Sequence, residues 1–272
     1  MDTVSRRALP PDLICLSVDV EWASPEVLAD TVRLLDEHAL RATFFCTHAG
    51  VEVPGHERGL HPNFRCAGET VRALRATAGA GGSNLTDTAV YEHVVRTTRA
   101  FCPEAVGVRA HSLFYESDLL PIYRQAGIEY DSSYFLPLAA GLRPMWKECG
   151  ILEIPIHYMD HCDLAEQATG FRLDGLGLGQ PGLKVLDFHP NLIFLNAATT
   201  GQYLASKPHY HDADRLRRLR HPGRGVRTLF IELLDAIAGR GWPTATLAEM
   251  NAAMRAGADS PTDSAVAPRG VA

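Results

Sequence analysis

The stretch LICLSVDVEW, residues 13–22, is a short apolar run that ends in two acidic residues. An apolar run of this length is typical of a buried strand, and it places Asp19 and Glu21 at the carboxyl end of that strand. The two residues are two apart on an extended chain, so their carboxylates share one face. They either close the strand through an Asx-type turn or serve a function. We favour function, because carboxylates beside an apolar run cost free energy unless they are partnered.

A helix is predicted directly after this strand. Ser24 is suited to the N-cap and Pro25 to the first turn, and an apolar face continues to about His38. ATFFCT, residues 42–47, then predicts a second buried strand. A strand, a helix and another strand form a βαβ unit, which indicates a parallel sheet.

The same alternation of strands and helices continues along the chain. About seven strands with helices between them, and no GxGxxG sequence after the first strand, favour a distorted (β/α)7 barrel of one domain over a doubly wound sheet. The barrel is expected to span residues 13–255, between an N-terminal extension (1–12) and a disordered tail (256–272) without apolar periodicity. The later predicted strands are 106–110, 128–130, 151–156, 184–188 and 244–247, and the later predicted helices are 86–101, 117–126, 226–238 and 248–255.

Composition excludes several classes of protein. The 272 residues are 46% hydrophobic and 21% charged, which suffices for a large core and excludes a disordered chain. The formal net charge of −6 argues against nucleic-acid or membrane-surface binding, because both need a cationic footprint. The six cysteines form neither a CxxC pair nor a regular framework, so no zinc ribbon or disulfide scaffold is expected. The sequence shows no signal peptide and no apolar run that would span a membrane, so we predict a cytoplasmic protein.

Polar side chains follow several of the predicted strands. In a β/α barrel, the carboxyl ends of the strands and the loops after them carry the chemistry. Two carboxylates and three histidines from separate strand ends are the donors of a mononuclear metal site with an acid and a base beside it. The candidate residues at these positions are Asp19, Glu21, His61, Asn63, Arg109, His111, Asp131 and His189.

Each histidine also has a plain structural interpretation. His61 would be a solvated loop residue, but two glycines and a proline shape the backbone around it, which favours a function. His189 precedes a proline, which restricts it to extended geometry and so aims its side chain. His111 stands two residues after Arg109 and is as easily a hydrogen-bonded loop residue as a ligand.

Six short motifs occur in order along the chain: SVDVEW at 17–22, GHERGLHP at 55–62, GVRAHS at 107–112, GIEYDSSY at 127–134, LEIPI at 152–156 and VLDFHPN at 185–191. This order resembles that of the polysaccharide deacetylase (NodB-homology) family, also called carbohydrate esterase family 4. The resemblance spans residues 13 to about 250. It implies a distorted (β/α)7 barrel that uses a divalent metal, usually zinc, to hydrolyse the N-acetyl group of an amino sugar.

The resemblance also implies a role for each matching residue. Asp19 would be the general base that deprotonates metal-bound water, and Arg109 the arginine that orients this base. Glu21 would take the position of the metal-ligand carboxylate, although the family's more usual first motif is two adjacent aspartates. His61 would be the first metal histidine, and His189 the general acid that protonates the leaving amine.

The second motif departs from the family pattern. That pattern is His-(Ser/Thr)-x-x-His-Pro with both histidines binding metal, whereas the residue four after His61 is Arg65. An arginine keeps its proton throughout the working pH range and is no metal ligand. Either His111 replaces the missing ligand, or His56 turns inward, or the metal is lost. We favour His111, because it lies in another catalytic motif and imidazole is a common zinc ligand.

Few residues point to the substrate. Trp22 directly follows Glu21 and is suited to line a sugar, and Asn63 is a further substrate-binding candidate. The resemblance implies that Asp131 is a supporting carboxylate that lines the site. The segment 209–227 is rich in arginine, and it is either a solvated surface or a binding site for the phosphate of a nucleotide sugar.

Together, these residues predict metal-dependent hydrolysis of an N-acetyl amide on a small amino-sugar substrate, with release of acetate. The substrate would be a nucleotide sugar, a polysaccharide unit or a natural-product intermediate. Two alternatives remain open at this point. One is a deformylase or another C–N amide hydrolase with a non-sugar substrate, and the other is a metal-free, catalytically silent barrel used for binding.

Overall fold

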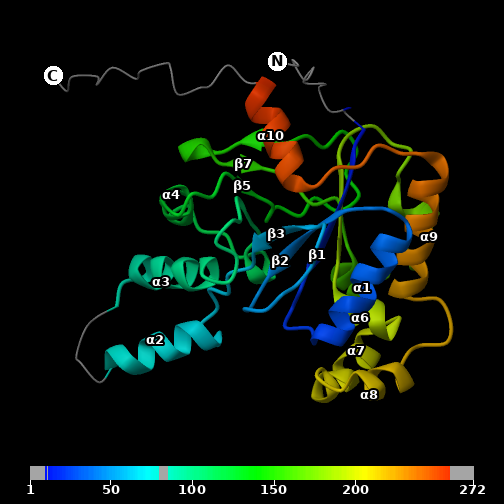
Figure 1. The fold of residues 1–272 in the computed structure, drawn as a ribbon, viewed down its shortest axis with the longest axis horizontal. Coiled ribbons are helices and arrows are strands. Elements are labelled where there is room, and N and C mark those ends of the chain that lie inside the picture. Colours follow the sequence, from blue (N-terminus) through cyan, green and yellow to red (C-terminus); the bar gives the residue numbers. More distant parts are fainter. Residues whose placement is uncertain (1–9, 11, 80–84, 258–272) are drawn as a thin grey trace.

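The first strand, β1 (Ile14–Asp19), pairs in parallel with β2 (Ala42–Cys46) on one side and with β9 (Lys184–Phe188) on the other. The computed structural model describes residues 10, 12–79 and 85–257 (Figure 1). In these residues, nine strands form one sheet in the order β6-β7-β5-β4-β3-β2-β1-β9-β8, parallel except for the antiparallel pair β6 and β7. The other strands are β3 (Glu57–Leu60), β4 (Gly107–Val108), β5 (Tyr130–Asp131), β6 (Met145–Trp146), β7 (Leu152–Glu153) and β8 (Tyr158–Met159).

The sheet curls round because one stretch of chain joins its two sides. β7 pairs with β5, and β8, which follows shortly afterwards in the chain, pairs with β9. β7 and β8 therefore share one position in the ring. Together with β1, β2, β3, β4, β5 and β9 they define seven strand positions. The predicted distorted (β/α)7 barrel of a single domain is confirmed.

The alternation of side chains along the strands divides them between two cores. On β1, Cys15 packs in the barrel interior, and because side chains on a strand alternate with period two, Ser17 and Asp19 continue the interior face towards the carboxyl end. On β9, Val185 packs in the same interior core and Asp187 follows it. The residues between them, such as Leu16, pack against the helices outside the barrel. Polar groups from two neighbouring strands are thus brought together at one end of the barrel.

Helices cover the outside of the sheet and its amino end. Ser24 accepts a hydrogen bond from the backbone N–H of Val27 at 3.4 Å and Pro25 opens the helix, as predicted. In Figure 1, α10 lies beside the amino ends of the strands, whereas α7 and α8 lie at the opposite end of the molecule. The α-helices are α1 (Pro25–Glu37), α2 (Glu69–Gly79), α3 (Asp87–Arg99), α4 (Leu119–Gln125), α5 (Asp160–Glu166), α6 (Pro190–Leu195), α7 (Thr200–Ser206), α8 (Ala213–Arg218), α9 (Val226–Arg240) and α10 (Leu247–Gly257), and the 3₁₀-helices are η1 (His111–Leu113), η2 (Glu148–Gly150), η3 (Leu173–Leu176) and η4 (Lys207–His209).

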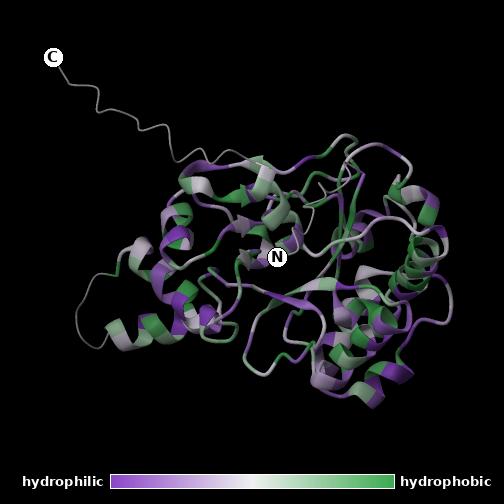
Figure 2. Ribbon diagram, turned by 45° about the horizontal axis from the view of Figure 1, so that its top comes forward, coloured by the Kyte–Doolittle hydropathy of each residue, from purple (hydrophilic) through white to green (hydrophobic). Residues whose placement is uncertain are grey.

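Hydropathy follows this arrangement. The strands are largely hydrophobic in colour and the helices carry both colours (Figure 2), which is typical of amphipathic helices that cover a buried sheet. Within the part of the chain that the structure describes, no helix has both the length and the hydropathy of a membrane span. The cytoplasmic location stays a prediction of the sequence.

Several elements differ from the expectation. The helices α2, α5, α6, α7 and α8 were not predicted; the last four are only six or seven residues long, about two turns, and so show little 3.6-residue periodicity. The strand predicted at 106–110 is reduced to β4, and the strand predicted at 244–247 is reduced to a single bridge between Ile14 and Thr244. Most of the predicted N-terminal extension and C-terminal tail, residues 1–9, 11 and 258–272, lies outside the described residues.

Candidate active site

Side chains at the ends of four strands, β1, β4, β8 and β9, converge at the carboxyl end of the barrel. They surround a cavity of about 240 Å³. Parallel strands all end on the same edge of a sheet, so residues far apart in the sequence meet there. The residues that line the cavity are Asp19, Glu21, His111, Ser112, Leu113, Met159, His161, His189, Tyr203 and Lys207.

Arg109, which follows β4, forms the floor of the site. Its guanidinium is fully buried, and its Nη1 donates to the Asp19 carboxylate at 3.0 Å, to Ser17 Oγ at 2.9 Å and to the Asp187 carboxylate. Its Nε donates to the Ser132 carbonyl at 2.8 Å. A buried charge is costly unless it is paired and hydrogen-bonded, and both conditions are met here. The predicted contact between Arg109 and Asp19 is present.

Glu21 lies between two histidines. Its Oε1 is 3.2 Å from His61 Nε2 and 2.6 Å from His111 Nδ1. Burial alone would raise the pKa of Glu21, but the hydrogen bonds from His111 and His61 outweigh burial and hold this pKa well below its usual value. The three side chains offer ligand atoms that all lie within 4.8 Å of one another. This cluster brings together the three residues that were predicted as metal ligands.

The backbone at the end of β1 is bent so that Glu21 reaches this cluster. Glu21 and Trp22 have φ values of 48° and 55°, which are uncommon for residues other than glycine. The backbone N–H of Trp22 donates to Thr47 Oγ1 at 3.1 Å, which holds the turn. Strained backbone of this kind occurs where surrounding structure fixes it, often at functional sites. The interpretation of the acidic pair as a mere strand-closing turn is therefore not favoured.

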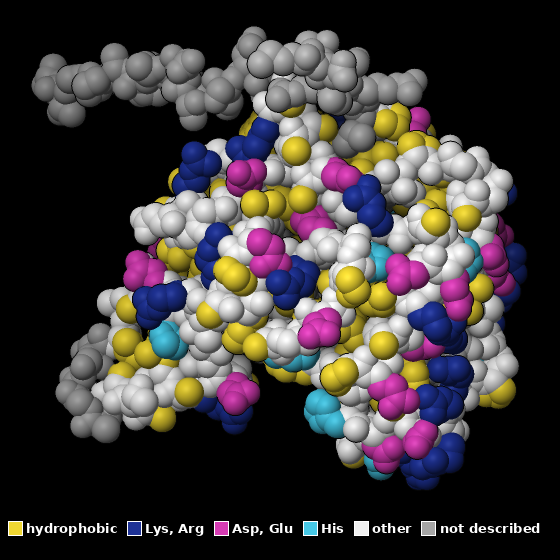
Figure 3. Space-filling model, viewed as in Figure 1, with side chains coloured by type: hydrophobic (Ala, Val, Ile, Leu, Met, Phe, Trp, Pro, Cys, Tyr) yellow, Lys and Arg dark blue, Asp and Glu magenta, His cyan; other side chains and the backbone are white. Residues whose placement is uncertain are grey.

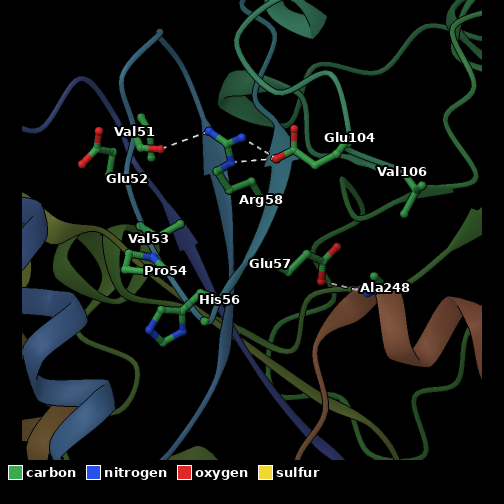
Figure 4. A pocket seen from close by; sticks show the side chains of 11 residues that line it. Val51, Glu52, Val53, Pro54, His56, Glu57, Arg58, Glu104, Val106 and Ala248 are labelled. Atoms are coloured by element: carbon green, nitrogen blue, oxygen red, sulfur yellow. Dashed lines mark hydrogen bonds and ion pairs between the residues drawn. The ribbon is translucent and has the colours of Figure 1, made fainter.

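The positions of the residues in the second motif show which of them lie near the Glu21 cluster. His56, the alternative ligand, accepts a hydrogen bond from the backbone N–H of Ala42 at 3.2 Å and lines a separate hollow beside the start of β3 (Figure 4). Arg65 is exposed and takes no part in the cluster. Because a proline directly follows His61, His61 also fits the second histidine of the family pattern, and the first then falls on Glu57. Glu57 starts β3, and its carboxylate accepts a hydrogen bond from the backbone N–H of Ala248 at 2.9 Å, so it does not join the cluster either.

His189, which follows β9, is held by a residue that was not predicted. Its Nδ1 is 2.6 Å from Asp160 Oδ1, and its backbone N–H donates to Asp160 Oδ2 at 2.9 Å. Burial on its own would lower the pKa of His189, but the carboxylate of Asp160 outweighs burial and raises this pKa to about 10. His189 is therefore a cation at neutral pH.

Three further candidates lie outside the cavity lining. Asn63 accepts a hydrogen bond from the backbone N–H of Arg65 at 3.0 Å and serves its own loop. Asp131 is buried and accepts a hydrogen bond from Lys147 at 2.8 Å, and it does not line the cavity, contrary to what the resemblance implied. Trp22 is 37% exposed, and its ring packs edge-on against the ring of His111 at 5.3 Å. A sugar-lining role for Trp22 at the rim stays a prediction.

The arginine-rich segment 209–227 is partly paired with carboxylates. Three of its six arginines pair with carboxylates of α1, α8 and α9, and blue and magenta side chains are interspersed over that side of the molecule (Figure 3). The pairs are Arg217 with Glu26 and Asp214, Arg224 with Glu232, and Arg227 with Asp30. The solvated-surface interpretation of this segment is favoured, because half of its arginines are paired with nearby carboxylates and none of the six lines the cavity.

The residues that sequence reasoning missed are Asp160, Asp187 and Lys207. Asp187 stands in the quoted motif VLDFHPN, and its spacing of two from both Val185 and His189 placed it on the interior face. Asp160 directly follows β8, which was not recognised as a strand. Lys207 comes from η4 and carries no local signal, because only the tertiary fold brings it to the cavity.

The curled barrel and the polar side chains at its strand ends have the arrangement that the six sequence motifs predicted. The model of the WbmS-like polysaccharide deacetylase family matches residues 16–207. The chain belongs to this family, which confirms the resemblance of the sequence motifs and supports de-N-acetylation as the general activity.

Two solved structures have the same fold. One, from Bordetella bronchiseptica, is described as a polysaccharide deacetylase involved in O-antigen biosynthesis; it is 25% identical with a TM-score of 0.69, over 82% of this chain and 90% of that chain. Another, from Mycobacterium smegmatis and also described as a polysaccharide deacetylase, is 14% identical with a TM-score of 0.50, over 94% of this chain and 93% of that chain. A search of the curated proteins finds no match to this chain.

Proposed function

We propose that this protein hydrolyses the N-acetyl amide of an amino-sugar unit in a metal-dependent reaction that releases acetate. Membership of the deacetylase family supports the general activity. The observation that carries the finer proposal is the convergence of Glu21, His61 and His111 beside Asp19 and His189. A cluster of ligands, a base and an acid at one cavity are the parts that amide hydrolysis needs.

The donor set fits a divalent ion. One carboxylate and two imidazoles are the protein ligands of many catalytic zinc sites, and they leave a position open for water or substrate. Ligand atoms of Glu21, His61 and His111 lie within 4.8 Å of one another. These three residues would hold the ion, which would supply Lewis acidity that acidifies water and polarises the amide carbonyl.

Asp19 is placed to act as the general base. Its Oδ1 accepts the hydrogen bond from Arg109 at 3.0 Å, and its Oδ2 lies 3.8 Å from His61 Nε2. One oxygen is therefore fixed by the guanidinium while the other faces the cluster. A carboxylate held in this way accepts the proton of the attacking water without first having to reorient.

His189 is placed to act as the general acid. Its Nδ1 is engaged by Asp160, so Nε2 is the ring nitrogen that is left to face the cavity. With its pKa raised to about 10 by the Asp160 carboxylate, against the opposing effect of burial, it carries a proton at neutral pH. Donation of this proton to the amide nitrogen lets the amine leave as a neutral molecule, whereas an amine anion is a very poor leaving group.

Metal content and acetate release of the purified protein test this proposal together. We expect about one divalent ion per chain and acetate release from at least one N-acetylated amino sugar or nucleotide sugar. Asp19→Asn should keep the metal and lose activity by a factor of about 10² to 10⁴, the usual contribution of a general base. His61→Ala should lose both metal and activity.

His93→Ala is the matched control, because His93 lies on α3, outside the cavity lining. It should change neither the metal content nor the rate. Protein without stoichiometric metal after gentle purification would contradict the metal-dependent mechanism. Loss of metal in Asp19→Asn but not in His61→Ala would overturn the assignment of roles.

A further inference from the structure

One wall of the active-site cavity carries a lysine whose charge the proposed reaction does not use. The chain has three lysines. Lys147 pairs with Asp131 and with Glu153, and Lys184 is buried with its ammonium bonded to backbone carbonyls. Lys207 is exposed and lines the cavity, and no carboxylate pairs with it in the described part of the chain.

The carboxylates that line the cavity have partners other than Lys207. Asp19 is bound by Arg109 at 3.0 Å. Glu21 is bound by His61 and His111 at 3.2 Å and 2.6 Å, and it would face the metal ion when one is bound. The cationic charge of Lys207 is therefore left over, and it faces the space that the substrate would occupy.

Aromatic contacts hold the lysine at this wall. Lys207 Nζ lies 5.0 Å from the centre of the Tyr203 ring, which is the geometry of a cation–π contact. The Tyr203 ring packs edge-on against His161 at 5.7 Å, and His161 lies 5.6 Å from the ring of His189. A continuous row of rings thus connects the proposed general acid to the lysine.

The volume of the cavity limits the size of the substrate group that can lie between His189 and Lys207. Drug-sized ligands occupy pockets of roughly 300 to 1,000 Å³, and this cavity measures about 240 Å³. Its volume suits a single sugar unit rather than several. A group that reaches both His189 and Lys207 therefore belongs to the sugar unit whose amide is hydrolysed, or is attached directly to it.

We propose that Lys207 selects an amino-sugar substrate that carries an anionic group, a carboxylate or a phosphate, on the reacting unit. This inference rests on the proposed function of the same cavity. A hydrogen bond to a charged partner is about twice as strong as one between neutral groups, so an ammonium at the cavity wall favours the anionic sugar over its neutral analogue. Lys207 would act on substrate binding rather than on the chemical step.

Binding calorimetry on the full-length protein tests this inference without requiring turnover. The three probes are N-acetylglucosamine, N-acetylglucosamine 1-phosphate and N-acetylglucosaminuronic acid, which are neutral, phosphorylated and carboxylated respectively. We expect one of the two anionic sugars to bind at least tenfold more tightly than the neutral sugar. Lys207→Met should weaken binding of that anionic sugar by roughly tenfold and leave binding of the neutral sugar unchanged. Lys207→Arg should keep most of the preference.

Arg218→Met is the matched control, because it removes one positive charge from exposed α8, outside the cavity lining. Three results would each overturn the inference: no preference for either anionic sugar, an equal loss for neutral and anionic sugars in Lys207→Met, or the same loss in Arg218→Met. Acetate release from each of the three sugars, measured in parallel, reports the proposed function separately. Anion-selective binding without acetate release from any probe would count against the proposed function and not against the role of Lys207.

Discussion

Arg109 determines where the proposed base can lie. Its Nη1 is shared by Asp19 and Asp187, and its guanidinium also stacks on the Phe45 ring at 4.3 Å. Burial raises the pKa of Asp187 to about 7, because it outweighs the opposing effect of Arg109. The guanidinium thus holds two carboxylates from adjacent strands, and Asp19 needs no reorganisation before it accepts a proton.

The contact between Asp160 and His189 predicts how the reaction depends on pH. The pKa of His189 is raised from 6.5 to about 10 by the Asp160 carboxylate, against the effect of burial. A general acid works below its pKa, so the alkaline limb of kcat should lie near 10 in the natural protein. In Asp160→Asn that limb should move to about 6.5 or lower, and kcat at about pH 8 should fall roughly 30-fold because so little His189 stays protonated. A pH profile of kcat for both proteins measures this shift.

The same contact between Asp160 and His189 should make the free energy of unfolding depend on pH. A histidine whose folded-state pKa is raised stabilises the fold below its unfolded pKa, and this contribution is lost as pH rises through the folded value. The natural protein should therefore lose stability towards pH 10, and Asp160→Asn should not show this loss. Asp235→Asn, a change at an exposed carboxylate of α9, is the control.

If kcat of Asp160→Asn falls equally at every pH, Asp160 does not tune the pKa of His189.

At the scale of secondary-structure elements, the strands position the site through their alternation and their close packing. Ser17 and Asp19 on β1 and Asp187 on β9 reach the interior because they continue the faces of Cys15 and Val185. β4 is only two residues long, yet it delivers Arg109. Its first residue, Gly107, leaves room for the buried ring of Tyr130 from the neighbouring strand.

Gly107→Ala should therefore destabilise the barrel. A Cβ at this position would lie 1.9 Å from the Tyr130 ring, which has no free space in the core. We expect a loss of about 3 kcal/mol in the free energy of unfolding, the upper part of the usual range for overpacking. Urea denaturation measures it. Gly179→Ala is the matched control, since no atom lies within 4 Å of the added Cβ, and a similar loss there would contradict the packing argument.

At the scale of the whole molecule, the sequence predicts the barrel and most of the strand-end residues. Apolar runs followed by polar groups identify Asp19, Glu21, Arg109 and His189, because a parallel barrel gathers every strand end on one rim. The choice of His111 over His56 followed from its place in a strand-end motif, and the geometry brings His111, not His56, next to Glu21.

The parts that could not be predicted depend on tertiary structure. Asp160 follows a two-residue strand, which is too short for a recognisable period. Lys207 reaches the cavity only because α7 and η4 fold back over the strand ends. The sequence instead indicated the arginines of 209–227 as a candidate phosphate site. Their ion pairs are with carboxylates far away in the sequence or on other elements, so a run of charge in the sequence does not predict them.

The central claim is that His111 completes a metal site with Glu21 and His61 in place of the missing motif histidine. Calorimetric titration of the metal-free protein with Zn²⁺ tests it most directly. We predict one tight site in the natural protein and in His56→Ala, and a loss of affinity of at least about a hundredfold in His111→Ala, because a two-ligand site is incomplete for zinc. Unchanged affinity in His111→Ala, or loss of the site in His56→Ala instead, would contradict the account.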